Sequence, residues 1–314
     1  MRPRTRLLTP RMEGLLQRIQ RAERTPFHAM TPQQARASYE AVAEILDLPR
    51  AALKRVEDLS LPAADGTPLA ARLYAASDAR PPVLLYLHGG GFVVGSLETH
   101  DSLCRQLALR SGAAVLALDY RRAPEHRFPT AVDDAWAALR WLRQHGASLG
   151  IDSRRLAVGG DSAGGTLAAV CALLARDQGL HLGLQLLITP GTAAQGDSPS
   201  RRLFANGFLL DDTTIEWFFD QYLDRAQRSD WRFAPLLRDD LEGVAPACVI
   251  LAECDPVVDE GLAYADRLRS AGASVTLELY RGVTHDFIKM GRALPEAGDA
   301  LQAAADAMKG TWEA

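Results

Sequence analysis

Short apolar runs alternate with segments of helical periodicity along most of this chain, and this alternation restricts the fold more than any other feature. The apolar runs are 83–87, 114–118, 156–158, 184–188, 248–251 and 275–279, and the helical segments are 98–111, 130–145, 164–176 and 258–270. Two earlier strand-like runs, 56–62 and 69–74, flank an Asp65-Gly66 turn. Apolar strands separated by helices are typical of a parallel sheet covered on both faces. We therefore predict an α/β fold with a mostly parallel, eight-stranded sheet.

Two regions interrupt this alternation. Residues 1–50 show helical patterns without a strand signal, and Thr31-Pro32 is a typical helix start. Residues 191–240 begin with a polar loop and continue with an aromatic-rich segment. Because open α/β sheets bind ligands at the carboxyl ends of their strands, we expect both regions to pack there as a helical cap. The expected division is cap helices at 1–50 and an α/β-domain at 51–314 that carries a cap insertion at about 191–240.

Arginines crowd the first 25 residues, with apolar residues between them at helical spacing. These arginines are Arg2, Arg4, Arg6, Arg11, Arg18, Arg21 and Arg24. The pattern indicates an amphipathic helix with a solvated basic face. A helix that binds a membrane surface or an anionic partner is the alternative.

Composition narrows the partners and the compartment. The formal net charge of −4 argues against nucleic-acid binding, because such proteins usually carry a basic excess. Four cysteines without a CxxC pair, Cys104, Cys171, Cys248 and Cys254, indicate free thiols in a reducing compartment. There is no HExxH motif, and no apolar run is long enough to span a membrane. We expect a cytoplasmic protein with no metal and no cofactor, and self-association as a homodimer stays open.

The segment Gly160-Asp161-Ser162-Ala163-Gly164 has the form GxSxG and lies between a predicted strand and a predicted helix. In that setting the motif forms a sharp turn that presents the serine at the helix N-terminus. The flanking glycines remove side chains that would collide in such a turn. We therefore predict that Ser162 is a nucleophile. A glycine-rich helix start with a serine N-cap is the alternative.

A serine of this kind needs a histidine base, and in this type of fold the base is the last of the three groups along the chain. Only His181 and His285 follow Ser162. His181 precedes a predicted central strand, whereas His285 follows the predicted strand 275–279 at its carboxyl end. That end lies at the same sheet edge as the serine, so we assign His285 as the base.

The acid partner is expected just after the preceding strand, 248–251. Glu253, Asp255 and Asp259 are the candidates. Asp255 is followed by Pro256, which stiffens the loop directly beyond the strand. We prefer Asp255, with a role in orienting the imidazole and stabilising its charged form.

Three consecutive glycines, Gly89-Gly90-Gly91, follow an apolar strand and His88. Consecutive glycines allow backbone N–H groups to turn toward a ligand. Together with the N–H of Ala163 they are suited to stabilise the oxyanion of a tetrahedral intermediate. A flexible loop or a phosphate cradle is the alternative, although no GK[ST] follows as in a P-loop. His88 precedes the serine, so we expect it to have a structural hydrogen-bonding role.

Together these motifs resemble the bacterial esterase branch of the hormone-sensitive-lipase family. The resemblance extends from about residue 50 to about residue 310 and rests on 88–92, 119–129, 160–165 and on Asp255-Pro256 with Asp259-Glu260-Gly261. It implies an α/β-hydrolase fold with a helical cap, no cofactor, and hydrolysis of short-chain carboxylic esters. At the matching positions it implies a triad of Ser162, Asp255 and His285, oxyanion donors at Gly90, Gly91 and Ala163, and supporting roles for His88, Gly89 and Asp161.

The expected activity is hydrolysis of small short- to medium-chain acyl esters through an acyl-enzyme. An amide, formamide or lactone hydrolase with the same triad is one alternative, and a non-catalytic small-ligand receptor on this scaffold is another. Candidate pocket walls are apolar residues near the active-site loops or in the cap: Phe92, Phe208, Val258 and Ile288. Arg122 and Val257-Val258 depart from the family's pattern, and the second departure affects the pocket near the acid.

Overall fold

A single eight-stranded sheet forms the centre of the protein. The structure, a computed structural model, describes residues 7–77, 79–193 and 197–313. The strand order is β1-β2-β4-β3-β5-β6-β7-β8; β2 pairs antiparallel with β1 and β4, and the remaining pairings are parallel. The predicted fold class is confirmed. The strands are β1 (Arg55–Pro62), β2 (Pro68–Ala75), β3 (Val83–Leu87), β4 (Ala114–Leu118), β5 (Leu156–Asp161), β6 (Leu184–Ile188), β7 (Ala247–Cys254) and β8 (Val275–Thr284).

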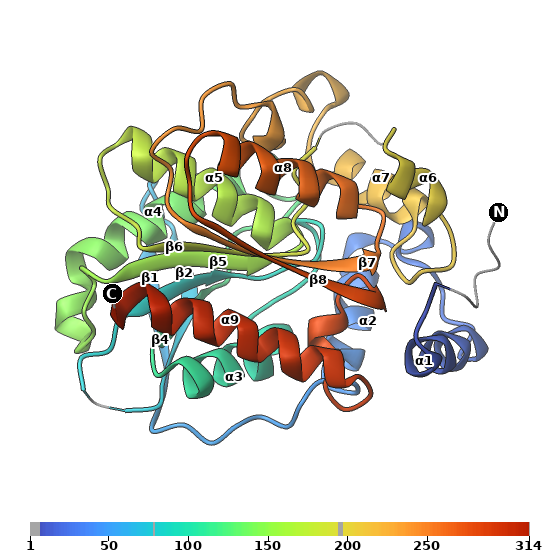
Figure 1. Cartoon of the computed structure of the whole chain (residues 1–314), viewed down its shortest axis with the longest axis horizontal. Coiled ribbons are helices and arrows are strands. Elements are labelled where there is room, and N and C mark those ends of the chain that lie inside the picture. Colours follow the sequence, from blue (N-terminus) through green and yellow to red (C-terminus); the bar gives the residue numbers. More distant parts are fainter. Residues whose placement is uncertain (1–6, 78, 194–196, 314) are drawn as a thin grey trace.

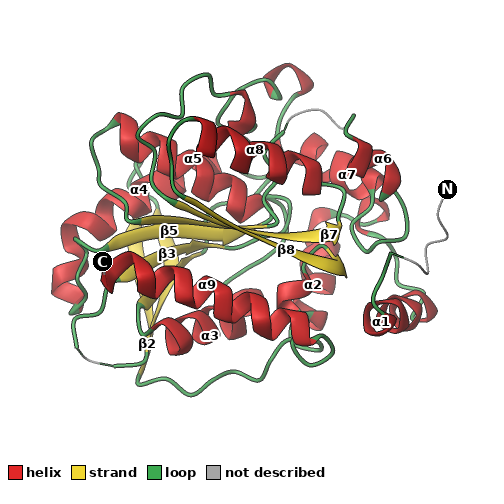
Figure 2. Cartoon of the chain, in the orientation of Figure 1, coloured by secondary structure: helices red, strands yellow, loops and turns green. Residues whose placement is uncertain are grey.

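Helices cover both faces of this sheet (Figure 1, Figure 2). Helices α3 (Asp101–Ser111) and α9 (Pro295–Glu313) pack together on one face, and α4 (Thr130–His145), α5 (Ala163–Asp177) and α8 (Val258–Ser270) lie on the other. Helix α9 was not predicted. Alanines occupy many of its positions, so its apolar residues contrast weakly with their neighbours and its periodicity is faint.

Three strands extend further than the apolar pattern predicts, all at the same edge of the sheet. Strand β5 continues through Gly159 and Gly160 to Asp161, β7 continues to Cys254, and β8 to Thr284. These extra residues are mostly small or polar, but a ladder needs only their backbone groups. Gly160 and Asp161 pair with Leu187 and Ile188 of β6. As a result, the residues just after these strands meet at one edge.

Two segments lie beyond that edge (Figure 1). The N-terminal segment contains α1 (Pro10–Arg21), η2 (Phe27–Ala29) and α2 (Pro32–Val42). The segment between β6 and β7 contains α6 (Pro199–Leu203), α7 (Asp212–Tyr222), η5 (Arg225–Gln227) and η6 (Pro235–Leu237). Three further single turns are η3 (Glu98–His100), η4 (Gly146–Leu149) and η7 (Phe287–Lys289).

The N-terminal segment and the insertion contact each other. The rings of Phe27 and Phe218 are 5.9 Å apart, and His28 Nδ1 lies 3.4 Å from Thr214 Oγ1. Arg36 of α2 also anchors the N-terminal segment to the α/β-domain. Its guanidinium donates to Val93 O at 2.8 Å and to Ala123 O at 2.7 Å.

Helix α1 has the predicted amphipathic form, with Met12, Leu15 and Leu16 buried and Arg18 and Arg21 exposed. The arginines at positions 2, 4 and 6 lie outside the described residues. Within the described ranges, no helix is both long enough and apolar enough to cross a bilayer.

The stretch after β4 is braced by a buried ion pair. Arg121 donates through Nη2 to Asp134 Oδ1 at 2.6 Å, and its own backbone N–H donates to Asp134 Oδ2 at 3.0 Å. Asp134 is fully buried on α4, and Arg121 also reaches the exposed Asp65 at 2.7 Å. The pair fixes the loop that follows β4 against α4.

Asp134→Ala should lower the free energy of unfolding by about 3 kcal/mol, because it leaves a largely buried guanidinium and a backbone N–H without their acceptor. Chemical denaturation at neutral pH measures the loss. Asp65→Ala removes the exposed partner of the same arginine and serves as the control, with a much smaller loss. Equal losses in the two variants would contradict this account.

Candidate active site

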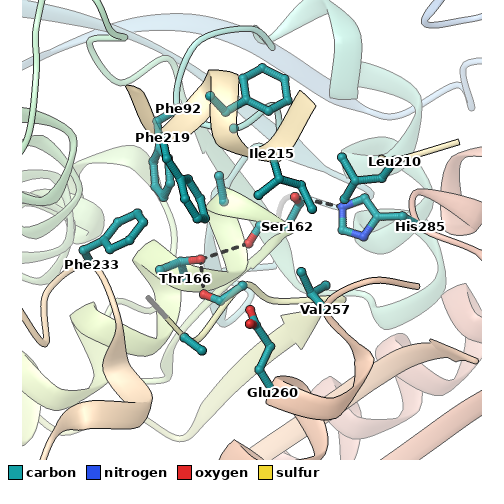
Figure 3. Close-up of a pocket in the computed structure, with 15 residues that line it drawn as sticks. Phe92, Ser162, Thr166, Leu210, Ile215, Phe219, Phe233, Val257, Glu260 and His285 are labelled. Carbon is teal, nitrogen blue, oxygen red and sulfur yellow. Dashed lines mark hydrogen bonds between the residues drawn. The ribbon is translucent and has the colours of Figure 1, made fainter. Parts of the chain in front are cut away.

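Ser162 lies in a strained turn between β5 and α5. Its φ is 52° and its ψ is −121°, a conformation that non-glycine residues rarely adopt. A Cβ on Gly164 would lie 1.9 Å from Leu87 O, and one on Gly160 would lie 2.3 Å from the same atom. Both glycines are therefore needed for the turn to pack against the end of β3. The turn aims the Ser162 side chain into a cavity (Figure 3).

A continuous chain of hydrogen bonds joins the three residues predicted as a triad. His285 Nε2 lies 2.9 Å from Ser162 Oγ, and His285 Nδ1 lies 2.7 Å from Asp255 Oδ2. Asp255 Oδ1 accepts the N–H of Val257 at 3.0 Å, which fixes the carboxylate. With Nδ1–H donated to the carboxylate, Nε2 is free to accept the serine proton.

The other candidates make different contacts. Glu253 accepts the N–H of Gly282 at 2.8 Å, and Asp259 accepts the N–H of Ser200 at 2.8 Å. His181 is exposed. Among the three carboxylates considered, Asp255 alone is hydrogen-bonded to His285 in the described structure.

Electrostatics favour the charged form of His285. Burial by itself would lower the pKa of the imidazole, but the adjacent Asp255 carboxylate outweighs it, and the pKa of His285 is raised above its ordinary value. The pair thus stabilises an imidazolium beside Ser162.

The glycine loop after β3 approaches Ser162 closely. Gly91 and Ala163 line the same cavity as Ser162, whereas Gly90 does not. Gly90 and Gly91 have φ values of 120° and 59°, which glycine adopts without strain. Ala163 is the first residue of α5, so its N–H has no partner inside the helix. Gly91 and Ala163 thus lie beside Ser162 in the wall of the cavity.

Asp161 and His88 both contact this loop through polar atoms of Gly89. Asp161 is buried and accepts hydrogen bonds from Tyr86 Oη at 2.6 Å and from the N–H of Gly89 at 3.1 Å. Burial alone would raise the pKa of Asp161, but the neighbouring His100 outweighs it and lowers that pKa. His88 Nδ1 lies 2.8 Å from Gly89 O, and its ring stacks on Tyr120. Both residues therefore contact the loop, and Asp161 directly precedes Ser162 in the chain.

The cavity beside Ser162 is mainly apolar and draws much of its wall from the insertion (Figure 3). Its lining residues include Phe92, Leu210, Ile215, Phe218, Phe219, Phe233 and Val257. Phe92 was a predicted wall and is one. Sequence analysis did not assign the wall residues of the insertion, because they come close to Ser162 only through tertiary packing.

Three predicted walls are not among the described residues that line the cavity, and we correct them. Val258 begins α8 and is buried, and the preceding Val257 faces the cavity instead. Neighbouring residues in a helical turn point in different directions. Phe208 packs edge-to-face on Phe204 at 4.9 Å. Ile288 is 1% exposed within the core.

Glu260 is a polar wall residue that sequence reasoning did not assign. It lies on the first turn of α8 and faces the cavity (Figure 3). Its Oε1 accepts the N–H of Thr192 at 2.8 Å. Burial raises the pKa of Glu260 to about 8, although hydrogen bonds from Thr192 and Ala193 oppose the shift. Burial therefore favours the uncharged form of this carboxyl group. Its place in the Asp259-Glu260-Gly261 motif was its only signal in the sequence.

Within the described residues, no group of three histidine, cysteine or acidic side chains is placed to bind a metal. The cysteines are buried as free thiols, and burial raises the pKa of Cys171, Cys248 and Cys254 to about 12. These thiols are therefore poor nucleophiles at neutral pH.

Gly91→Ala should destabilise the protein by about 1–3 kcal/mol, through overpacking and a strained φ. A Cβ at Gly91 would lie 2.2 Å from Cγ of Phe218 in α7. Thermal and chemical unfolding measure the effect. Gly14→Ala is the control, since a Cβ there meets no atom within 4 Å in the described structure and alanine favours the helix. An unchanged stability in Gly91→Ala would show that α7 does not pack tightly against the glycine loop.

Comparison with known proteins identifies relatives along nearly the whole chain. A family model described as α/β-hydrolase fold matches residues 84–289. Ethyl acetate hydrolase of Pseudomonas putida is 44% identical, over 90% of this chain and 92% of its own. Carboxylic ester hydrolase LipN of Mycobacterium tuberculosis is 41% identical, over 82% of this chain and 70% of its own.

Solved structures agree with this relationship. An ester hydrolase from the metagenome of Lake Arreo superposes with a TM-score of 0.94 at 37% identity, over 98% of this chain and 100% of its own. The hyperthermophilic esterase of Pyrobaculum calidifontis gives a TM-score of 0.92 at 38% identity, over 98% of this chain and 100% of its own. The resemblance predicted from the motifs is confirmed, and the chain belongs to the hormone-sensitive-lipase-like esterase branch of the α/β-hydrolase family.

Proposed function

We propose that this protein is a carboxylic ester hydrolase in which Ser162 is the nucleophile, His285 the general base and Asp255 the residue that orients it. The observation that carries the proposal is the hydrogen-bond chain from Asp255 through His285 to Ser162, which ends at the wall of an apolar cavity. The named relatives, among them the ethyl acetate hydrolase and LipN, are ester hydrolases.

In the proposed first half-reaction, Ser162 Oγ attacks the ester carbonyl while its proton passes to His285 Nε2. Asp255 stabilises the imidazolium, and the N–H groups of Gly90, Gly91 and Ala163 stabilise the tetrahedral oxyanion. The carbon–oxygen bond to the alcohol then breaks, and the imidazolium protonates the leaving alcohol. In the second half, His285 takes a proton from water as the water attacks the acyl-enzyme, and returning that proton to Ser162 releases the acid.

The cavity favours esters with short to medium acyl chains. Its walls include the rings of Phe218, Phe219 and Phe233, which limit the space for a long chain. Forcing extra methylenes into such a packed site is unfavourable. The proposed substrates are therefore small esters.

The proposed cap consists of residues 1–50 and about 191–240, above the catalytic domain at 51–314. Its support is that α7 contributes Ile215, Phe218 and Phe219 to the cavity, while Phe27 of η2 packs on Phe218. The net charge of −4 argues against a nucleic-acid partner. The four free thiols fit a cytoplasmic location. Assembly as a homodimer is part of the proposal, and size-exclusion chromatography tests it.

The activity test measures kcat/KM for p-nitrophenyl esters of increasing acyl length, below any micellar concentration. We expect a maximum between butyrate and octanoate, and Ser162→Ala should retain only the small residual catalysis that binding and the oxyanion donors supply. Rates on a matching anilide and a lactone separate ester hydrolysis from the related reactions. A steady rise to palmitate would contradict the proposed substrate class, and near-normal turnover by Ser162→Ala would remove the assigned nucleophile.

The pH dependence tests the assigned base. Because Asp255 raises the pKa of His285 and only neutral imidazole accepts the serine proton, kcat/KM should rise with pH through an apparent pKa above about 6.5. Asp255→Asn removes the negative charge, so this limb should move to lower pH while kcat falls on the order of 10⁴-fold. Asp259→Asn is the matched control. If Asp259→Asn loses more activity than Asp255→Asn, the acid is misassigned.

A further inference from the structure

Phe219 of α7 lines the cavity and also contacts two largely buried arginine side chains. Its ring meets Phe233 edge-to-face, with centroids 4.9 Å apart and planes at 84°. The guanidinium carbons of Arg201 and Arg228 also lie near this ring, at 5.9 Å and 5.1 Å from its centroid. Both distances are within the range of cation–π attraction.

One of the two arginines precedes α7 in the chain and the other follows it, and both bind the same carboxylate. Arg201 of α6 donates to Glu216 Oε1 at 3.1 Å, and Arg228, just after η5, donates to Glu216 Oε2 at 2.7 Å. Asp212 pairs in addition with Arg201, and Asp220 with Arg228 at 2.9 Å. Glu216 lies one helical turn before Phe219, so the ion network and the ring belong to one face of α7.

These guanidinium groups are shielded from solvent. The side chain of Arg201 is 6% exposed and that of Arg228 is 14% exposed. Arg228 Nε is buried and has no hydrogen-bond partner among the described residues. Removing a charge from water is costly unless partners compensate, so both the carboxylates and the aromatic face stabilise these positions. The position of the Phe219 ring and the positions of the two guanidinium groups therefore depend on each other.

We propose that Arg201 and Arg228 are positioning residues for substrate specificity, which hold the ring of Phe219 in the wall of the cavity and so limit the length of the chain that fits. This inference rests on the proposed ester hydrolysis. In it, the two arginines and Phe219 set the longest chain that the enzyme accepts. Without the guanidinium groups the ring can turn away and enlarge the cavity. With them the ring stays in the cavity wall.

The test compares Phe219→Ala, Arg201→Met and Arg228→Met, since methionine keeps an unbranched side chain and removes the charge. We measure kcat/KM for p-nitrophenyl esters from acetate to decanoate, and for butyrate esters of alcohols of increasing length. Phe219→Ala should raise the ratio of decanoate to butyrate turnover about tenfold or more. Each methionine variant should raise the same ratio about threefold or more. Adding Arg228→Met to Phe219→Ala should change the ratio no further, because the ring through which it acts is gone.

Arg238→Met is the matched control. Arg238 also stacks on an aromatic ring, that of Trp231 at 4.6 Å, but neither residue lines the cavity. This variant should leave the chain-length profile unchanged. A folded Arg201→Met or Arg228→Met with the wild-type profile would overturn the proposal, and so would a wild-type profile in Phe219→Ala. If the methionine variants do not fold, Arg228→Lys decides: a smaller shift in the same direction supports the proposal, and no shift overturns it.

A second measurement does not depend on turnover. In the Ser162→Ala background, calorimetry gives the dissociation constants of straight-chain alcohols from butanol to decanol. The Phe219 and arginine variants should favour the longer alcohols relative to their parent, whether or not esters are the substrates. An absence of ester turnover in the wild-type protein would refute the proposed function, whereas an unchanged preference for alcohol length would refute the role of the arginines.

Discussion

The buried carboxylate of Asp161 fixes the distance between Ser162 and the glycine loop, and the rest of the site depends on that distance. Asp161 ends β5 directly before Ser162, and its side chain accepts hydrogen bonds from Tyr86 and Gly89 on the neighbouring β3 strand and loop. His100 supplies a third partner at 3.1 Å. A fully buried carboxylate without partners would be strongly destabilising. This requirement holds the ends of two strands in one arrangement.

Around this fixed point, the site is built from loops that begin where parallel strands end. Ser162 follows β5, Asp255 follows β7 and His285 follows β8, so the sheet itself sets their spacing. Short hydrogen bonds and tight backbone contacts then remove the remaining freedom. The close approach of Gly160 and Gly164 to Leu87 is one example, since any side chain at either glycine would collide with that backbone. The geometry of the proposed triad is thus held by rigid elements.

The substrate side of the cavity is organised differently. Aromatic rings from the insertion line it, and Phe27 of the N-terminal segment packs on one of them, Phe218. Lys289, four residues after His285 and almost fully buried, donates to Tyr39 Oη of α2 at 2.8 Å. This contact and those of Arg36 tie α2 to the loops that carry His285 and the glycines. The chemistry therefore belongs to the sheet edge, while the shape of the cavity belongs to the packing above it.

The amino-acid sequence by itself determined the sheet and the order of the serine, the acid and the histidine along the chain. Continuous apolar runs specify parallel strands buried on both faces, and Gly160–Gly164 admits few structures other than a strand-to-helix turn. Hence Ser162, Asp255 and His285 could be selected before any distance was known. Only the tertiary structure decided which side chains form the cavity. Val257 rather than Val258, and Phe219 rather than Phe208, line it because side-chain direction and long-range packing leave no periodic signal in the sequence.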